Sequence, residues 1–293
     1  MTNLLGVVGD IVEDVVVATR APFAAGSDTP SDIVRRRGGS AANVAVAASA
    51  LVPTRFFGCI GDDATGRRLA GELMGVPSID ARLQVSSAAP TGTIVVILDA
   101  HGERHMFPDR GANLYLAPID DAQLADLAVL HATAYSLESG STADVVPAAL
   151  AAVAESGRVT SLDVSSAALI AQFGVEWLLG VINWLQPTML LANADEAALL
   201  GWDALEPSAL GLVIVKHGAG PALVRTPMGA WRVPTTPLPA TDTTGAGDAF
   251  AAGVLASVIS SNLTAGALLA GGESLAVMLA QAGHLAAAAR LLG

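Results

Sequence analysis

The feature that most constrains the fold of this chain is an alternation of helical and strand-like segments beyond residue 120. Apolar residues recur there at helical spacing or in short runs, in this order: helix at 121–128, strand at 129–135, helix at 142–156, strand at 158–165, a long apolar helix at 168–185, and a strand followed by a helix within 188–201. This order is typical of a parallel sheet with helices on both faces. The sequence therefore predicts an α/β fold.

Turn residues divide the rest of the chain into further strands and helices. Residues 40–52 have helical spacing, and 211–240 contains several strand-like runs separated by Gly and Pro turns, which indicates an antiparallel edge of the sheet. No fixed-period repeat and no low-complexity linker interrupts the sequence. We expect one domain over residues 1–293, with a small β lid built from about residues 12–37 and 88–112.

Charge and cysteine content exclude several classes of protein. The chain has 15 Lys plus Arg against 27 Asp plus Glu, so nonspecific binding to nucleic acid or to an anionic membrane surface has no electrostatic basis. Cys59 is the single cysteine, and the N-terminus lacks the basic region of a signal peptide. The uncharged run 249–272 is long enough to span a membrane, but Ser260 and Thr264 predict a helix end and a new N-cap within it. We expect a cytoplasmic protein.

Common cofactor motifs are missing from the sequence. A Walker loop requires Gly-Lys-Ser/Thr, whereas the only lysine, Lys216, is followed by His217. The run GAGDAF lacks the third glycine of a dinucleotide fingerprint. His101 and His105 have the spacing of a helical zinc site, but they fall in a strand-turn-strand segment. These patterns argue against dinucleotide and zinc chemistry.

The stretch DTTGAGDAF at 242–250 carries the strongest chemical signal. It predicts a glycine turn that leads into a helix, with small residues that leave backbone amides open to an anion. Asp248 in the first helical turn has two interpretations. It stabilises the helix dipole, or it acts as a base beside amides that stabilise a transferred phosphoryl group.

Two segments resemble the signatures of the ribokinase-like (PfkB) family of carbohydrate kinases. They are DTTGAGD near the C-terminus and GGSAANVAVAASAL near the N-terminus, and they occur in the order found in the family. The resemblance continues through GDIVED, GCIGDDATG, PTGTIVVILDAHGER, DRGAN, AYSLES, LANADE and VKHGAG. It implies a three-layer α/β/α sandwich with a mostly parallel sheet and a β lid. It also implies that ATP and Mg²⁺ are used to phosphorylate a hydroxymethyl group of a sugar or nucleoside.

The resemblance assigns catalytic roles to residues of the C-terminal motif. Asp248 matches the catalytic base, and Gly245, Ala246 and Gly247 match the anion hole. Asp242 and Thr244 match residues that bind an activating monovalent cation such as K⁺ in many members. The alternative for this pair is a turn-stabilising role.

On the acceptor side, the resemblance assigns sugar binding to the N-terminal motif. Gly38, Gly39 and Asn43 match the substrate signature, Asp14 matches an acid that holds sugar hydroxyls, and Glu138 is a further candidate. Taken singly, these residues are also ordinary turn glycines or solvated acids.

The nucleotide side is expected in the last strands of the sheet. Asn193 and Glu196 match an N-x-x-E element in which the acid acts on Mg²⁺, often through water; the alternative is a helix capping box. Lys216 and Gly218 resemble a strand and turn that border the nucleotide. Pro221 stands where a glycine is common.

Substrate identity stays open at this stage. Val12 and Ser40 depart from the pattern of ribose-specific members, and Arg110 either meets an acidic sugar or caps the lid. A nucleoside kinase and a sugar-binding relative without turnover are the alternatives to a sugar kinase. By analogy with the family, the lid is also expected to form a homodimer.

Overall fold

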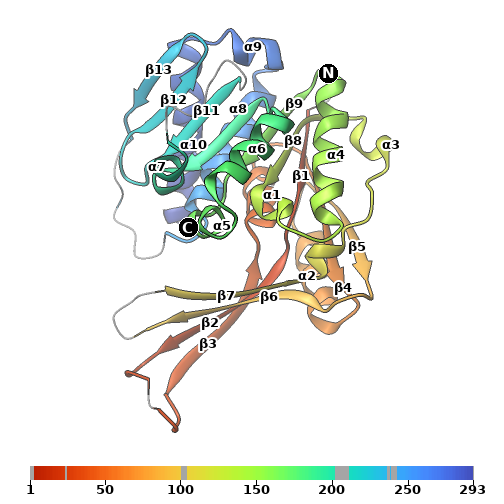
Figure 1. The fold of residues 1–293 in the computed structure, drawn as a ribbon, viewed down its shortest axis with the longest axis vertical. Coiled ribbons are helices and arrows are strands. Elements are labelled where there is room, and N and C mark those ends of the chain that lie inside the picture. The colour runs from red at the N-terminus through yellow and green to blue at the C-terminus, as the bar shows by residue number, and fades with distance from the viewer. Residues whose placement is uncertain are drawn as a thin grey trace.

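The computed structural model describes residues 3–23, 25–99, 104–201, 211–235, 238 and 243–292. A nine-stranded sheet has the order β13-β12-β11-β10-β9-β8-β1-β4-β5 (Figure 1). Its strands are β1 (Leu4–Val8), β4 (Thr54–Gly61), β5 (Ile79–Ser86), β8 (Leu127–Thr133), β9 (Val159–Asp163), β10 (Met189–Asn193), β11 (Leu212–Lys216), β12 (Ala222–Thr226) and β13 (Gly229–Val233). All neighbours from β5 to β11 pair in parallel, whereas β12 and β13 form an antiparallel edge. The predicted mostly parallel sheet is confirmed.

Helices cover both faces of this sheet. They are α1 (Ser40–Ser49), α2 (Ala64–Met74), α3 (Asp121–Leu124), α4 (Thr142–Glu155), α5 (Ala167–Phe173), α6 (Val175–Leu185), α7 (Ala194–Leu200), α8 (Ala246–Ser260), α9 (Ala265–Leu269) and α10 (Glu273–Leu292). Successive side chains of a strand point to opposite faces. Val129 and Ile214 accordingly join the core beneath α1 and α8, whereas Leu130 and Val213 join the core beneath α4 and α6. The result is a three-layer α/β/α sandwich.

Two predicted helices differ in the structure. The long helix expected at 168–185 is divided into α5 and α6, whose axes differ by 104°. Gly174 between them has φ +92°, a left-handed conformation that ends one helix before the next begins. The helix expected at 121–128 ends at Leu124, because Leu127 is buried in the sheet as the start of β8.

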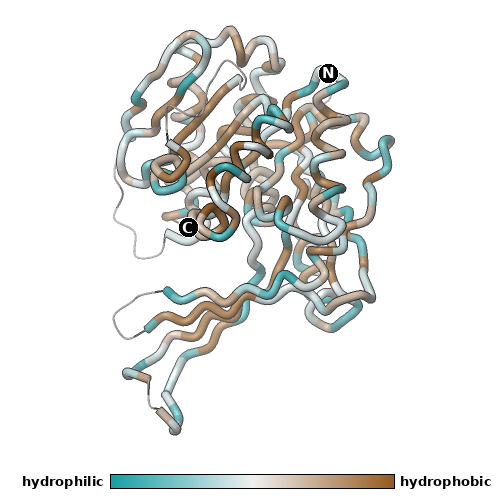
Figure 2. The backbone as a smooth tube through the Cα atoms, viewed as in Figure 1, coloured by the Kyte–Doolittle hydropathy of each residue, from teal (hydrophilic) through white to brown (hydrophobic). Residues whose placement is uncertain are grey.

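A second sheet projects from the body as a separate arm (Figure 1). Its order is β3-β2-β6-β7, from β2 (Val12–Thr19), β3 (Ser31–Gly38), β6 (Thr91–Leu98) and β7 (Arg104–Gly111). These strands coincide with the segments expected to form the lid, except that β3 extends one residue further, to Gly38. Figure 2 shows hydrophobic stretches along them, and Ile33, Val34, Met106 and Phe107 are each more than half exposed.

One described helix, α10, is long and apolar enough to cross a membrane by length and composition. It packs along α8 in the present fold. The uncharged run 249–272 flagged in the sequence contains two helices, α8 and α9, and Thr264 caps the second through the amide of Ala267.

Candidate active site

The turn before α8 is closed by a hydrogen bond of 3.1 Å from the amide of Ala246 to the carbonyl of Thr243, and the helix start has no side-chain cap among the described residues. Gly245 adopts φ +76°, which favours glycine, and Ala246 begins the helix. The first amides of a helix lack intrahelical partners and attract anions. The predicted anion hole of Gly245, Ala246 and Gly247 therefore lies at an uncapped helix start.

Asp248, in the first turn of α8, is held by two side chains of α1. Ser40 Oγ donates to Asp248 Oδ1 over 2.7 Å, and Asn43 Nδ2 donates to Asp248 Oδ2 over 3.0 Å. Burial raises the pKa of Asp248, while the bonds from Ser40 and Asn43 and the charge of Lys216 oppose this shift; the net change is upward. A raised pKa makes this carboxylate a better proton acceptor.

The glycine pair before α1 lies against two acids of the N-terminal segment. A Cβ on Gly38 would stand 2.2 Å from Asp14 Oδ1, and a Cβ on Gly39 would stand 2.3 Å from the carbonyl oxygen of Asp10. Gly39 also has φ +94°. At Gly39 only glycine permits this approach, because the blocking atoms are backbone, whereas a Cβ at Gly38 would displace the Asp14 carboxylate. Burial raises the pKa of Asp14, with Arg36 and Arg37 opposing the shift.

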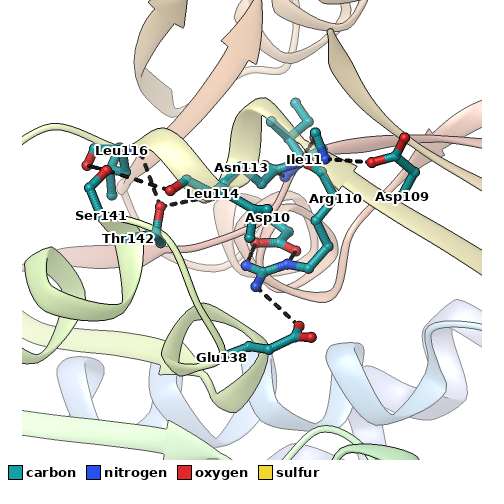
Figure 3. Close-up of polar contacts among 11 residues, drawn as sticks. Asp10, Ile11, Asp109, Arg110, Asn113, Leu114, Leu116, Glu138, Ser141 and Thr142 are labelled. Atoms are coloured by element: carbon teal, nitrogen blue, oxygen red, sulfur yellow. Dashed lines mark hydrogen bonds and ion pairs between the residues drawn. The ribbon is translucent and has the colours of Figure 1, made fainter. Parts of the chain in front are cut away.

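Arg110 bridges two acids, Asp10 and Glu138 (Figure 3). Its Nε and Nη2 donate to both carboxylate oxygens of Asp10 at 2.8 Å, and its Nη1 donates to Glu138 Oε2 at 3.3 Å. The Arg110 side chain is 11% exposed. Burial works to lower its pKa, but Asp10 and Glu138 outweigh burial and raise it. Arg110 is thus engaged by the protein's own carboxylates, and Asp10 is a buried acid that the motif comparison did not single out.

On the other side of Asp248, a cavity of about 660 Å³ opens between α8 and the ends of β9 to β11. This volume is in the usual range for small-molecule sites. Expected site residues among those that line the cavity are Asn193, Glu196, Lys216, Gly218, Ala246, Gly247 and Asp248. His284 and Asp163 also line it, and neither was assigned a role from the sequence.

Lys216 supplies the positive charge of this cavity. Its Nζ donates to Asp163 Oδ2 over 2.5 Å and lies 3.7 Å from the position of a Cβ on Gly247. Burial works to lower the pKa of Lys216, but the carboxylates around it, led by Asp163, raise it. A permanent cation therefore stands beside the uncapped start of α8.

The N-x-x-E element forms a capping box at the start of α7. Asn193 Oδ1 accepts from the amide of Glu196, and both Glu196 oxygens accept from Asn193, one from its backbone and one from its side chain. The capping box, which the sequence raised as the alternative to a magnesium role, is therefore present. Burial first, and the nearby charge of Asp163 next, raise the pKa of Glu196 to about 7.

The donor set of the cavity fits a magnesium ion that arrives with a nucleotide. Such an ion keeps waters and phosphate ligands and needs one or two protein carboxylates. Asp163, Asp195 and Glu196 line the cavity, and no group of three or more His, Cys, Asp or Glu side chains among the described residues forms a complete metal cage. The role of Glu196 toward Mg²⁺ stays a prediction.

The expected monovalent-cation site is a different case. Asp242 lies outside the described residues, and Arg104 of β7 donates to Thr244 Oγ1 over 2.7 Å. A guanidinium thus stands beside Thr244, and its charge disfavours a second cation. The role of this pair toward K⁺ stays a prediction.

Three further positions have defined places in the structure. His131 is fully buried, hydrogen-bonds Ser161 and has a pKa lowered by burial to about 4. Pro221 is the last residue before β12. Ser40 was noted in the sequence only as a departure from the ribose pattern, yet its hydroxyl donates a hydrogen bond to the carboxylate of Asp248. Its place directly after the glycine pair was the available signal.

Several known proteins are similar to this chain in sequence and in fold. The pfkB family carbohydrate kinase profile matches residues 2–291. A fructokinase from Klebsiella pneumoniae is 30% identical over 87% of this chain and 84% of its own length. An ATP-dependent ribose-1-phosphate kinase from Halopiger xanaduensis is 31% identical over 81% of this chain and 78% of its own length.

Solved structures agree at the level of the fold. A fructokinase with bound ATP from Xylella fastidiosa superposes with a TM-score of 0.83 at 22% identity, covering 98% of this chain and 92% of the other. The profile match over nearly the whole length shows that this chain belongs to the pfkB family of carbohydrate kinases.

Proposed function

We propose that this protein transfers the γ-phosphate of ATP to a hydroxymethyl group of a sugar, with Asp248 as the general base. The observation that carries the proposal is the position of Asp248: it stands at the uncapped start of α8, between the glycine-rich acceptor side and the cavity that contains Lys216. A base and an anion-stabilising helix start are two of the groups that proteins contribute to phosphoryl transfer.

In this mechanism Asp248 accepts the proton of the sugar hydroxyl as its oxygen attacks the γ-phosphorus. The bond between the γ-phosphorus and the β,γ-bridging oxygen breaks, and ADP leaves with that electron pair. The amides of Gly245 to Gly247 and the Lys216 ammonium stabilise the charge on the transferred group. Magnesium bound with the nucleotide supplies further charge neutralisation.

The acceptor side favours a neutral sugar. Asp14 and Glu138 offer carboxylates to hydroxyl groups, and Asn43 offers an amide beside the base. Arg110, in the DRGAN motif, is already paired with Asp10 and Glu138. An anionic acceptor would have to compete with both carboxylates for it. A nucleoside acceptor is the second candidate, because one relative is an aminoimidazole riboside kinase with 26% identity.

The test is ATP consumption across matched acceptors, with Mg²⁺ present and with or without K⁺. Fructose, ribose and other neutral sugars are compared with ribose 1-phosphate, keto-deoxy sugar acids and nucleosides. Turnover with one neutral sugar supports the proposal and names the substrate. Selective turnover with a phosphorylated or acidic sugar contradicts the acceptor class, and silence with ligand-induced stabilisation favours a binding protein without turnover.

Asp248→Asn tests the base. We expect turnover to fall roughly 100- to 10,000-fold while ATP still binds, because general-base catalysis contributes that much. Asp144→Asn, at an exposed position on α4, is the matched control. A rate near that of the wild type for Asp248→Asn would remove Asp248 from this role.

We also propose that the lids of two cytoplasmic copies pair. The exposed apolar side chains of β3 and β7, among them Ile33 and Phe107, support this arrangement. Light scattering after size-exclusion chromatography measures the mass. Ile33→Asp is expected to convert a dimer to a monomer, and a wild-type monomer would contradict the proposal.

A further inference from the structure

A lid arginine is connected to the proposed base through a single amide. Arg37 lies on β3 directly before the glycine pair, and its Nη1 donates to Asn43 Oδ1 over 3.0 Å. The Nδ2 of the same amide donates to Asp248 Oδ2 over 3.0 Å. Side chains from β3, α1 and α8 thus form one chain of hydrogen bonds that ends on the carboxylate.

The chemistry of the two ends sets the direction of this chain. A guanidinium only donates hydrogen bonds, and an ionised carboxylate only accepts them. The amide of Asn43 satisfies both neighbours in one orientation, with Oδ1 toward Arg37 and Nδ2 toward Asp248. Within the described part of the chain, the bond to Asn43 is the one side-chain hydrogen bond of the Arg37 guanidinium. Without Arg37, only the hydrogen bond to Asp248 would hold the amide, and the Asn43 side chain would be freer to leave this orientation.

We propose that Arg37 is a positioning residue that fixes the amide of Asn43 and thereby holds Asp248 in the geometry for proton transfer. The inference rests on the proposed role of Asp248 as the base. Arg37 acts through Asn43, and it makes the orientation of the base depend on the place of lid strand β3.

The electrostatic surroundings give this role a measurable signature. The hydrogen bond from Asn43 is one of the interactions that oppose the upward shift in the pKa of Asp248. Loss of a correctly oriented amide therefore raises that pKa further. Other charged or titratable groups near Asp248 are Asp14 on β2, Arg37 on β3, Tyr135 before α4, Asp163 on β9 and Lys216 on β11. Arg290 on α10 is also near, because its Nε lies 3.6 Å from a Cβ position on Gly245 that is itself 3.9 Å from Asp248 Oδ2.

A double-mutant cycle tests the inference at saturating sugar and ATP. We expect Arg37→Met to lower kcat about tenfold, the scale of one charge-assisted hydrogen bond, and to move the acidic limb of the kcat profile to higher pH. Arg37→Lys, which keeps a charged donor, should recover most of the rate. In an Asn43→Ala background, Arg37→Met should change kcat less than about twofold, because the intermediary is already absent.

Two results would overturn the positioning role. A full tenfold effect in the Asn43→Ala background would mean that Arg37 acts independently of Asn43. A raised KM for the sugar with unchanged kcat and pH profile would mean that Arg37 contacts the sugar itself. Arg20→Met is the control, since Arg20 is a lid arginine whose side chain is 64% exposed and pairs with Asp32.

The outcome is distinguishable from failure of the proposed function. If Asp248→Asn retains turnover, the base assignment fails. If Asp248→Asn is inactive while Arg37→Met matches the wild type, only the role of Arg37 fails. Thermal unfolding of each variant verifies folding, and Arg37→Gln takes the place of Arg37→Met in the cycle if the methionine variant does not fold.

Discussion

Ser40 and Asp248 are separated by 208 residues in the chain, yet Ser40 Oγ donates a hydrogen bond of 2.7 Å to Asp248 Oδ1. This bond opposes the upward pKa shift that burial imposes on Asp248. Ser40→Ala is therefore expected to raise the pKa of the base and to reduce kcat severalfold, most strongly at low pH. The measurement is the pH profile of kcat at saturating substrates.

Ser49→Ala is the matched control for this prediction. Ser49 ends the same helix, and its hydroxyl bonds to the carbonyl of Val46, away from the base. An unchanged acidic limb in Ser40→Ala would show that this hydrogen bond does not influence the titrating group.

The raised pKa of Glu196 predicts a pH-dependent contribution to stability. Its pKa is about 7 in the folded protein against 4.5 for the free group, so the folded state retains this proton more strongly than the unfolded state. The contribution is present below about pH 4.5 and is lost as pH rises through 7, with a magnitude on the order of 3 kcal/mol. Urea unfolding at pH 5 and pH 8 measures it.

Glu196→Gln mimics the protonated carboxyl group. The variant should match the wild type in stability at pH 5 and exceed it at pH 8. Its turnover should be low at both pH values, because the predicted role of Glu196 toward Mg²⁺ requires an ionised carboxylate. Glu155→Gln, at an exposed position at the end of α4, is the control. Equal stability differences at the two pH values would contradict the raised pKa.

Lys216 is expected to have two separable roles. Lys216→Met leaves the Asp163 side chain, 5% exposed, without its cation, which should destabilise the fold by about 3–5 kcal/mol. It should also raise the KM for ATP at least tenfold, because a cation beside the anion hole is lost. Unfolding and steady-state kinetics measure the two effects.

The double variant Lys216→Met with Asp163→Asn distinguishes these roles. Removal of the unpaired carboxylate should restore much of the stability but not the affinity for ATP. Recovery of both would indicate that Lys216 serves the fold alone and does not neutralise phosphate.

The close contact between Gly38 and Asp14 predicts a defect in sugar binding. Gly38→Ala places a Cβ 2.2 Å from Asp14 Oδ1, so the carboxylate must move. We expect the KM for the sugar to rise about tenfold, equivalent to the loss of one good hydrogen bond to a charged group, with the KM for ATP unchanged. Gly71→Ala on α2, where no atom lies within 4 Å of the new Cβ, should leave both constants unchanged. Equal kinetics for the two variants would argue against Asp14 as a sugar ligand.

Local patterns in the sequence were sufficient for the main layers of the fold. Continuous apolar runs mark buried parallel strands, and helical spacing marks their covering helices, because both depend on neighbours close in sequence. The division between α5 and α6 was not predicted, since an apolar helical pattern continues through Gly174 and only its left-handed backbone separates the two helices. Likewise, the pairing of Leu127 with Leu4 ended the helix expected at 121–128.

The motifs also determined the candidate chemistry: an acid at a glycine-rich helix start and a glycine pair before another helix. Only the tertiary structure decided how these groups are connected. It placed Ser40 and Asn43 on Asp248, paired Arg110 with Asp10, and set Arg104 beside Thr244. Each contact joins positions about 100 to 208 residues apart, and such side-chain partners leave no local periodicity to read. They follow from the folded arrangement of the strands and helices that carry them.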